Sequence, residues 1–277
     1  MTSPFVTSAW LAEHLTDPNI VVVDGSWHMP NSARNAQAEY LDGHIPGAVF
    51  FDIDAIADTD TDLPHMLPSP ADFARAVGAL GISQDMTIVV YDEVGLFSAP
   101  RVWWTFRAFG ARDVRILEGG GPRWRAERLP IESGLVARHP ARFEPRFDPA
   151  AAADFETVAA RSRDAGSQII DARPAPRFHA EAPEPRPGLR SGHIPGSLNV
   201  PVGLLSEQGL LKSPEALRDL FAGRGVDLTR PIITSCGSGI TAATLALALE
   251  QAGAGNVAVY DGSWAEWGSR PDAEVES

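Results

Sequence analysis

The sequence contains one cysteine, Cys236, among 277 residues. A single cysteine excludes an internal disulfide, and a free thiol suits a reducing compartment such as the cytoplasm. The longest apolar stretch, around residues 240–249, is about half of the roughly 20 residues that a membrane-spanning helix needs. The amino terminus has neither the pattern of a secretory signal nor that of a transit peptide. We therefore expect a cytoplasmic protein without a membrane partner.

Positive charge is also scarce, with 23 Lys and Arg against 36 Asp and Glu and a formal net charge of −13. Because no local basic cluster offsets this balance, we expect no nucleic-acid partner. The seven histidines are scattered and lack neighbouring ligands at a useful spacing, so no metal site is predicted. The glycines at 119–121 do not have the GxGxxG form of a nucleotide-binding loop. The sequence therefore predicts no cofactor.

An internal repeat dominates what the sequence does contain. The motif GHIPG at residues 43–47 recurs at residues 192–196. In each half a β-branched run ending in aspartate precedes the motif, and a further apolar run leading into a helix-like stretch follows it. A last matched block closes each half, at residues 114–119 and 257–262. Four matched blocks in the same order indicate a duplication.

Each half alternates short apolar β-branched runs with helix-like segments, which is typical of a parallel sheet covered by helices on both faces. Two helices have clear starts, at Ser69-Pro70 and at Ser213-Pro214, where a capping serine precedes a proline in the first turn. The first is expected to run to Leu80 and the second to Phe221. The predicted fold class is therefore α/β with two tandem domains.

The boundary between the domains is expected in a proline-rich and arginine-rich stretch without apolar periodicity. The prediction is a first domain over residues 1–138, a linker over 139–154 and a second domain over 155–277.

Cys236 lies between a predicted buried strand at 231–235 and a predicted helix at 240–251. Ligands usually bind at the carboxyl end of strands in such sheets. Gly237 and Gly239 allow backbone N–H groups to curl around an anion, and the helix start adds partial positive charge. Both effects favour the thiolate, so Cys236 is predicted to be a catalytic nucleophile.

Two other interpretations of this cysteine are weaker. A buried structural cysteine is common, but it would not need a Gly-Ser-Gly turn beside it. A Cys-dependent phosphatase requires an arginine six positions after the cysteine to hold a phosphate dianion, and this chain has Ala242 there.

The tandem GHIPG segments and the CGSGIT loop at 236–241 resemble the two-domain rhodanese family of sulfurtransferases, nearly from end to end. The loop is most similar to that of members that use 3-mercaptopyruvate, whereas thiosulfate-preferring members carry a basic CRxG loop. The resemblance implies transfer of sulfur from 3-mercaptopyruvate, through a Cys236 persulfide, to an acceptor such as thioredoxin, a small thiol or cyanide, with release of pyruvate. Thiosulfate:cyanide sulfur transfer and a non-catalytic rhodanese-like binding module are the alternatives.

The resemblance also implies a substrate site. Residues 177–186 are similar to a family segment whose first and last arginines bind the substrate carboxylate and carbonyl oxygen, which indicates Arg177 and Arg186. His179 stands where the family has a further arginine. The loop residues implied in binding are Gly237, Gly239, Ile240 and Thr241.

The family pairs its loop serine with a histidine and an acid. Ser238 matches the serine, and the resemblance assigns the histidine to His44. Asn35 stands where the family has aspartate, so Asp42 or Glu39 would have to supply the acid. In the first half, Asp92 occupies the place of the catalytic cysteine, so this half is predicted not to transfer sulfur.

Overall fold

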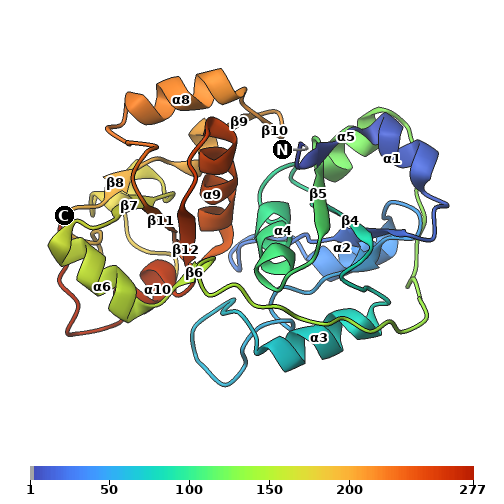
Figure 1. The fold of residues 1–277 in the computed structure, drawn as a ribbon, viewed down its shortest axis with the longest axis horizontal. Coiled ribbons are helices and arrows are strands. Elements are labelled where there is room, and N and C mark those ends of the chain that lie inside the picture. The colour runs from blue at the N-terminus through green and yellow to red at the C-terminus, as the bar shows by residue number, and fades with distance from the viewer. Residues whose placement is uncertain (1–2) are drawn as a thin grey trace. The chain divides into compact units, whose positions relative to one another are not determined.

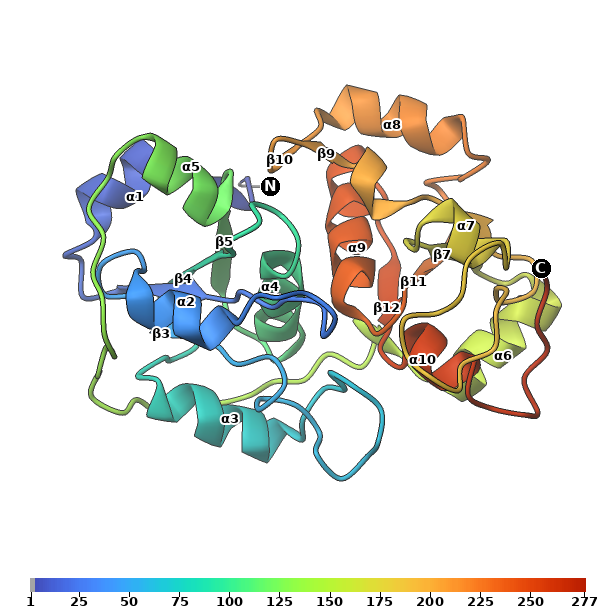
Figure 2. The same ribbon diagram turned by 180° about the vertical axis from the view of Figure 1, so that it is seen from behind.

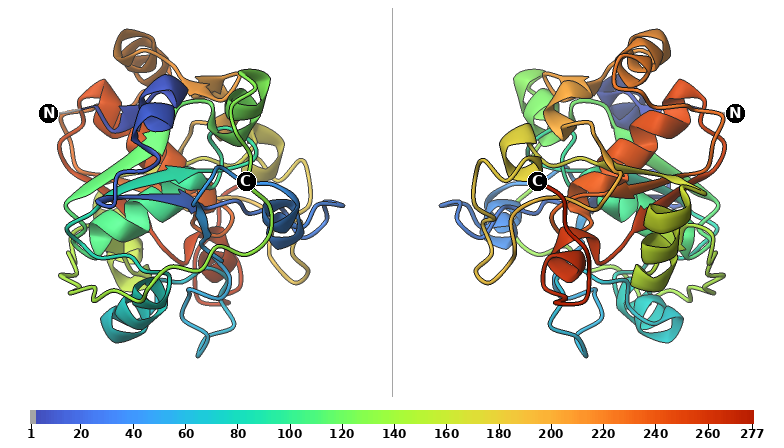
Figure 3. Two further views of the ribbon diagram at one scale, coloured as in Figure 1. Left: turned by 90° about the vertical axis from the view of Figure 1, so that its right-hand side faces the viewer. Right: turned by 90° about the vertical axis from the view of Figure 1, so that its left-hand side faces the viewer.

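The computed structural model describes residues 3–277, which divide into two compact units. Within the described residues, the first unit comprises 3–59, 67–148 and 208–210, and the second comprises 60–66, 149–207 and 211–277. Each unit contains a five-stranded parallel sheet with helices on both faces, and further views of the ribbon show this layering from the side (Figure 3). The predicted duplicated α/β fold is confirmed.

The first unit has the strand order β1-β5-β4-β2-β3, and Figure 1 labels β4 and β5 of this sheet. Its strands are β1 (Phe5–Val6), β2 (Ile20–Asp24), β3 (Val49–Phe50), β4 (Thr87–Tyr91) and β5 (Asp113–Leu117). Its helices are α1 (Ser8–His14), α2 (Ala36–Asp42), α3 (Pro70–Ala79), α4 (Ala99–Ala108) and α5 (Gly120–Ala126). Strand β2 is buried along its whole length, which explains its unbroken β-branched sequence.

Side chains of the first sheet alternate between two faces. Val22 and Val89 pack in one apolar cluster with Trp124 of α5, beside α1. Helix α4 packs against β4 and β5, and its Phe106 contacts Phe73 of α3 with ring centroids 5.4 Å apart. The two helical layers thus exclude water from the strand ends on which the loops are built.

The second unit repeats this order as β6-β12-β11-β7-β8. Its strands are β6 (Ala152–Ala153), β7 (Gln168–Asp171), β8 (Leu198–Asn199), β11 (Ile232–Ser235) and β12 (Val257–Tyr260), and β9 (Ser206–Glu207) and β10 (Leu210–Leu211) form a separate two-stranded sheet. Its helices are α6 (Phe155–Asp164), α7 (Ala175–Phe178), the 3₁₀ helix η1 (Val202–Leu204), α8 (Pro214–Ala222), α9 (Ile240–Ala252) and α10 (Ser263–Trp267).

Helix α9 is the most apolar helix of the second unit and lies beside α8 against β11 and β12 (Figure 2). Ile169 and Ile233 point to the opposite face, where they pack with Trp264 of α10 and Val158 of α6. A helix that is apolar on every side is stable only when it is covered, and ten residues of α9 are buried. Among residues 3–277, no helix is long and apolar enough to cross a membrane.

Both predicted helix starts are confirmed. The Ser69 hydroxyl accepts the N–H of Asp72 at 3.2 Å, and the Ser213 hydroxyl accepts the N–H of Ala216 at 3.3 Å. Each serine therefore satisfies one of the N–H groups that a helix start leaves without a partner. The proline that follows has no N–H group and so needs no acceptor.

Residues 139–148, within the stretch predicted as a linker, pack against the first unit. The Phe143 ring meets the Phe73 ring edge-on with centroids 5.3 Å apart, and the N–H of Ala141 donates to the carbonyl oxygen of Gly78 at 2.9 Å. From Pro149 the chain belongs to the second unit, and β6 adds an edge strand there.

Strand β4 ends in a loop that wraps around the Asp92 carboxylate, which is fully buried. Five backbone N–H groups donate to this carboxylate at 2.6 to 2.9 Å, from Val94, Gly95, Phe97, Ser98 and Ala99. The loop thus forms a cradle of amide groups, and α4 begins at its last member. Because buried N–H groups require acceptors, the Asp92 carboxylate holds the whole loop together.

Replacing Asp92 with alanine should therefore destabilise the first unit. The change leaves several buried N–H groups without an acceptor, and we expect the free energy of unfolding to fall by about 3 kcal/mol or more. Urea unfolding followed by tryptophan fluorescence measures this. Asp85→Ala is the control, because the Asp85 side chain is 56% exposed and its pair with Arg112 is exposed too. Equal unfolding midpoints for Asp92→Ala and wild type would contradict the cradle.

Candidate active site

Cys236 directly follows β11 and is 2% exposed. The chain then turns through residues 237–239 into α9, with Gly239 at φ 80°, a conformation that glycine adopts without strain. Ser238 is buried at 6% exposure, Ile240 is buried, and Thr241 is half-buried in the first turn of the helix. The predicted loop residues therefore lie directly after Cys236, at the carboxyl end of a central strand.

The start of α10 clamps the backbone of this loop. The Ser263 hydroxyl accepts the N–H of Cys236 at 3.1 Å and donates to the carbonyl oxygen of Tyr260 at 2.8 Å. The N–H groups of Trp264 and Ala265 donate to the carbonyl oxygens of Cys236 and Gly237 at 3.0 and 2.9 Å. These bonds tie the loop to the end of the neighbouring strand, β12.

Ser263 has φ 48°, although non-glycine residues avoid this region. Gly120, at the matching place of the first unit, has φ 55°. Strain of this kind costs about 1 kcal/mol or more and persists where the surroundings require it. The hydroxyl that binds the Cys236 N–H explains why a serine occupies the position. Ser263 lies in no motif that predicts this role, and the only signal in the sequence is its place in the repeat opposite a glycine.

Arg177 lies against the cysteine loop. A Cβ atom placed on Gly237 would be 3.1 Å from Nη2 of Arg177, so a side chain at this position would crowd the guanidinium. Arg177 is near the end of α7, in the proline-rich segment from which the sequence predicted a substrate contact. The structure thus brings a cationic side chain and the nucleophile loop together within one unit.

A buried carboxylate holds Arg177 in place. Oε1 of Glu184 accepts a hydrogen bond from Nε of Arg177 at 3.2 Å, and Oε2 forms a very close ion pair with Nη2. The Glu184 side chain is 2% exposed and also binds Nη1 of Arg173 at 2.8 Å. Arg173 in turn bonds Asp171, at the end of β7, at 2.7 Å.

Burial acts to lower the pKa of Arg173, but the carboxylates of Asp171 and Glu184 outweigh this effect and raise it. Arg173 is 1% exposed and lies over the Trp264 ring, 4.2 Å from its centroid. The result is a buried chain of alternating charges that runs from β7 to the cysteine loop.

Arg186 contacts a histidine that the sequence analysis did not identify. Its Nη2 lies 3.2 Å from Nε2 of His65, which is 5% exposed. Since a guanidinium can only donate, this ring nitrogen accepts and carries no proton in the contact. His65 belongs to residues 60–66, a short segment of the second unit that precedes α3 in the chain. No motif in the sequence marks this segment.

His44 is fully buried in the first unit. Its Nδ1 lies 2.7 Å from the carbonyl oxygen of Tyr40, its ring stacks on Tyr40 at 4.2 Å, and Nε2 is 4.0 Å from Glu132. His193 has the same set of contacts in the second unit, with Phe178 and Glu276. The repetition indicates that both histidines support the GHIPG turn.

Asn35, which stands where the family has aspartate, lies at the start of α2, and the two acids considered as partners of His44 lie on this helix. The Asn35 side chain caps the helix by accepting the N–H of Ala38 at 2.8 Å. Glu39 binds Arg34 and His28, at 2.7 and 2.9 Å, and these bonds lower the pKa of its carboxyl. Asp42 is an exposed residue at the helix end.

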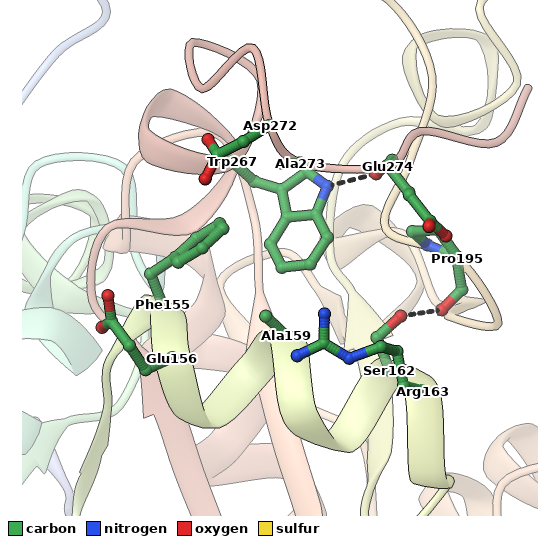
Figure 4. A pocket seen from close by; sticks show the side chains of 10 residues that line it. All are labelled: Phe155, Glu156, Ala159, Ser162, Arg163, Pro195, Trp267, Asp272, Ala273 and Glu274. Carbon is green, nitrogen blue, oxygen red and sulfur yellow. Dashed lines mark hydrogen bonds between the residues drawn. The ribbon is translucent and has the colours of Figure 1, made fainter.

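A cleft of about 220 Å³ in the second unit is separate from these residues (Figure 4). Its walls come from α6, α10, the GHIPG turn and the C-terminal segment. The indole N–H of Trp267 donates to Glu274, and the Ser162 hydroxyl donates to Pro195, both at 2.7 Å. Figure 4 shows these two hydrogen bonds as dashed lines. The indole N–H and the serine hydroxyl are therefore already bonded within the protein.

The fold occurs in both units, and the second unit adds a cysteine loop of the kind that sulfurtransferases use. The family model of the rhodanese-like domain matches residues 7–127 and 154–270, and the chain belongs to the rhodanese family.

Two curated proteins show the range of its relatives. The chain is 51% identical over 276 residues to the 3-mercaptopyruvate sulfurtransferase of Escherichia coli (strain K12), covering 99% of this chain and 98% of that protein. It is 44% identical over 278 residues to the thiosulfate sulfurtransferase of Bos taurus, covering 98% and 93%. The crystal structure of SseA, a 3-mercaptopyruvate sulfotransferase of Escherichia coli, matches with a TM-score of 0.88 and 49% identity over 95% of this chain and 99% of that one. The predicted family is confirmed.

Removing the Ser263 hydroxyl should release the cysteine loop. In both Ser263→Ala and Ser263→Gly the N–H of Cys236 loses its acceptor, and we expect alkylation of the single thiol by iodoacetamide to be several-fold faster. Ser263→Gly also relieves the positive φ, so it should be more stable than Ser263→Ala by about 1 kcal/mol.

Mass spectrometry of the alkylated protein and urea unfolding measure the two effects. Ser269→Ala is the control, because Ser269 is exposed and bonds only to its own turn at Glu266 among the contacts that the structure gives. Alkylation of both Ser263 variants at the wild-type rate would refute the clamp.

Proposed function

We propose that this chain moves sulfur from 3-mercaptopyruvate to an external acceptor through a persulfide on Cys236, and that it releases pyruvate. The observation that carries the proposal is the position of Arg177 against Gly237, which puts an anion-binding group beside the residue that follows the one thiol of the chain. The similarity to 3-mercaptopyruvate sulfurtransferases over nearly the whole length supports the same donor.

In the first half-reaction the Cys236 thiolate attacks the donor sulfur. A sulfur–sulfur bond forms and the carbon–sulfur bond breaks, so its electron pair passes to the carbon and gives the enolate of pyruvate. That enolate takes up the proton which the donor thiol loses, and pyruvate leaves. Arg177 and Arg186 hold the carboxylate and the carbonyl oxygen, where negative charge grows as the enolate forms.

The loop then holds the outer sulfur of the persulfide, which is negatively charged. Support comes from the first unit, where the matching loop directs five N–H groups onto the Asp92 carboxylate. The corresponding donors in the second unit are the N–H groups of Gly237, Gly239, Ile240 and Thr241, together with the hydroxyls of Ser238 and Thr241. A self-supplied carboxylate in one unit is thus replaced by a substrate-derived sulfur in the other.

A catalytic partnership of His44 with Ser238 remains a prediction. The contacts that His193 repeats favour a structural role for His44. His65, by contrast, touches the predicted substrate arginine Arg186 and belongs to the unit of the cysteine loop. We therefore place His65, rather than His44, beside the bound donor.

In the second half-reaction an external nucleophile removes the sulfur. The chain has no second cysteine that could resolve the persulfide, so the acceptor is a separate molecule. Thioredoxin, a small thiol and cyanide have the required nucleophilic sulfur or carbon. A free catalytic thiol is best preserved in a reducing compartment, so we place the reaction in the cytoplasm.

Thiosulfate is the second candidate donor, because the Bos taurus relative is a thiosulfate sulfurtransferase. The loop of this chain has the uncharged residues Gly237 and Ser238 after the cysteine, which gives a thiosulfate dianion less charge compensation. A purely non-catalytic module is a poorer fit, since the second unit keeps both the cysteine and the neighbouring cation.

Intact-protein mass spectrometry tests the persulfide. After incubation with 3-mercaptopyruvate, the wild type should gain one sulfur atom, about 32 Da, that dithiothreitol removes, because a persulfide is reducible. Cys236→Ser should gain none. Equal addition to both proteins would reject Cys236 as the carrier.

The arginine assignments predict losses in turnover. Arg177→Ala and Arg186→Ala should each lower kcat/KM for 3-mercaptopyruvate by about 10- to 100-fold, since a charge-assisted hydrogen bond contributes about 1.5–3 kcal/mol. Arg218→Ala is the matched control, because its guanidinium pairs with exposed Glu215 on α8. Steady-state kinetics of pyruvate release gives the values. Unchanged turnover in both site variants would remove these arginines from the donor site.

A further inference from the structure

We propose that Glu184 determines donor specificity: its buried carboxylate neutralises Arg177 and so makes the site selective for a singly charged donor over the thiosulfate dianion. The inference rests on the proposed function, because it concerns the donor bound by Arg177 and Arg186. It assigns a role to a residue that does not itself touch the reacting sulfur.

Glu184 is fixed from two sides. Pro183 and Pro185 flank it and limit the backbone of its loop, and its carboxylate oxygens are bonded by Arg173 and Arg177. Two of the three guanidinium nitrogens of Arg177 donate to Glu184. The side chain is 2% exposed, so water screens this pair only weakly. Glu184 therefore sets both the direction and the effective charge of Arg177.

The charges of the cluster balance. The carboxylates of Asp171 and Glu184 stand against the guanidiniums of Arg173 and Arg177, all linked by the bonds described above. Arg186 belongs to the same donor site, where its Nη2 lies 3.2 Å from Nε2 of His65. The Glu184 carboxylate thus lowers the positive charge that Arg177 brings to the donor site by one unit.

A lower positive charge favours one class of donor. 3-Mercaptopyruvate carries one carboxylate, and its carbonyl can accept a hydrogen bond from the second arginine. Thiosulfate brings two negative charges, which need more positive charge in a poorly hydrated place. Loss of the Glu184 charge adds one positive charge, which should improve the site for thiosulfate and misdirect Arg177 for the keto-acid.

Glu184→Gln is the test, because glutamine has nearly the same shape and no charge. For this variant we expect the ratio of kcat/KM for 3-mercaptopyruvate to kcat/KM for thiosulfate to fall at least about tenfold, a change that one unit charge can produce at a short distance in a protein. The shift should appear mainly in KM, because the charge acts on donor binding. Glu184→Asp keeps the charge and should keep the wild-type ratio within about twofold, even if both rates fall.

Glu181→Gln is the control in the same loop, because Glu181 is exposed, and its ratio should equal that of wild type. Equal losses for both donors in Glu184→Gln would reduce Glu184 to a structural support and overturn the proposal. The same holds if Glu184→Asp shifts the ratio as far as Glu184→Gln does.

A measurement on the wild type covers the case in which Glu184→Gln does not fold. Pyruvate, a monoanion, should inhibit competitively at a concentration at least about tenfold lower than sulfate, a dianion of similar size to thiosulfate. Equal inhibition constants would overturn the proposal. Failure of the proposed function is distinguishable from either result, because the wild type would then gain no sulfur on Cys236 from 3-mercaptopyruvate.

Discussion

The constraint on which the rest of the structure depends is that the backbone N–H groups of the loop at the end of a central strand need acceptors. In each unit this strand runs into a loop and then into a buried helix, so the amide groups of the loop cannot be left to water. In the first unit the Asp92 carboxylate accepts five of them. In the second unit the corresponding place, directly after β11, holds the buried Cys236.

Several further contacts of the second unit position the loop of Cys236 and the residues around it. Strand β11 pairs with β7 so that Ser235 lies opposite Asp171, and this register brings the start of the charge chain beside the cysteine. Asp171, Arg173 and Glu184 then carry the chain to Arg177, and Ser263 fixes the loop from the other neighbouring strand. Strand order and register thus decide which side chains can meet near the cysteine loop.

Much of this arrangement could be predicted from the sequence, because its signals are local. The repeated blocks gave the two sheets, the Ser-Pro pairs gave the starts of α3 and α8, and the glycines after Cys236 gave the loop. Arg177 was indicated by resemblance, and the structure brings it to Gly237. These features depend on neighbouring residues or on a motif that is continuous in the chain.

The residues that escaped prediction meet their partners only through tertiary structure. Ser263 is 27 positions from Cys236, and His65 is 121 positions from Arg186. Glu184 looks like one more exposed acid in a proline-rich loop until Arg173 and Arg177 close around it. Phe143 likewise packs on Phe73, which is distant in the sequence. The prolines around Phe143 indicated a linker and gave no sign of this contact.

The central claim is that the loop of Cys236 holds a sulfur anion as the loop of Asp92 holds its carboxylate. The most direct measurement is a crystal structure of the protein after treatment with 3-mercaptopyruvate. The account predicts an additional sulfur on Cys236 within hydrogen-bond distance of the backbone N–H groups of residues 237–241. An outer sulfur directed away from those groups, or a Cys236 left unmodified while pyruvate is released, would contradict it.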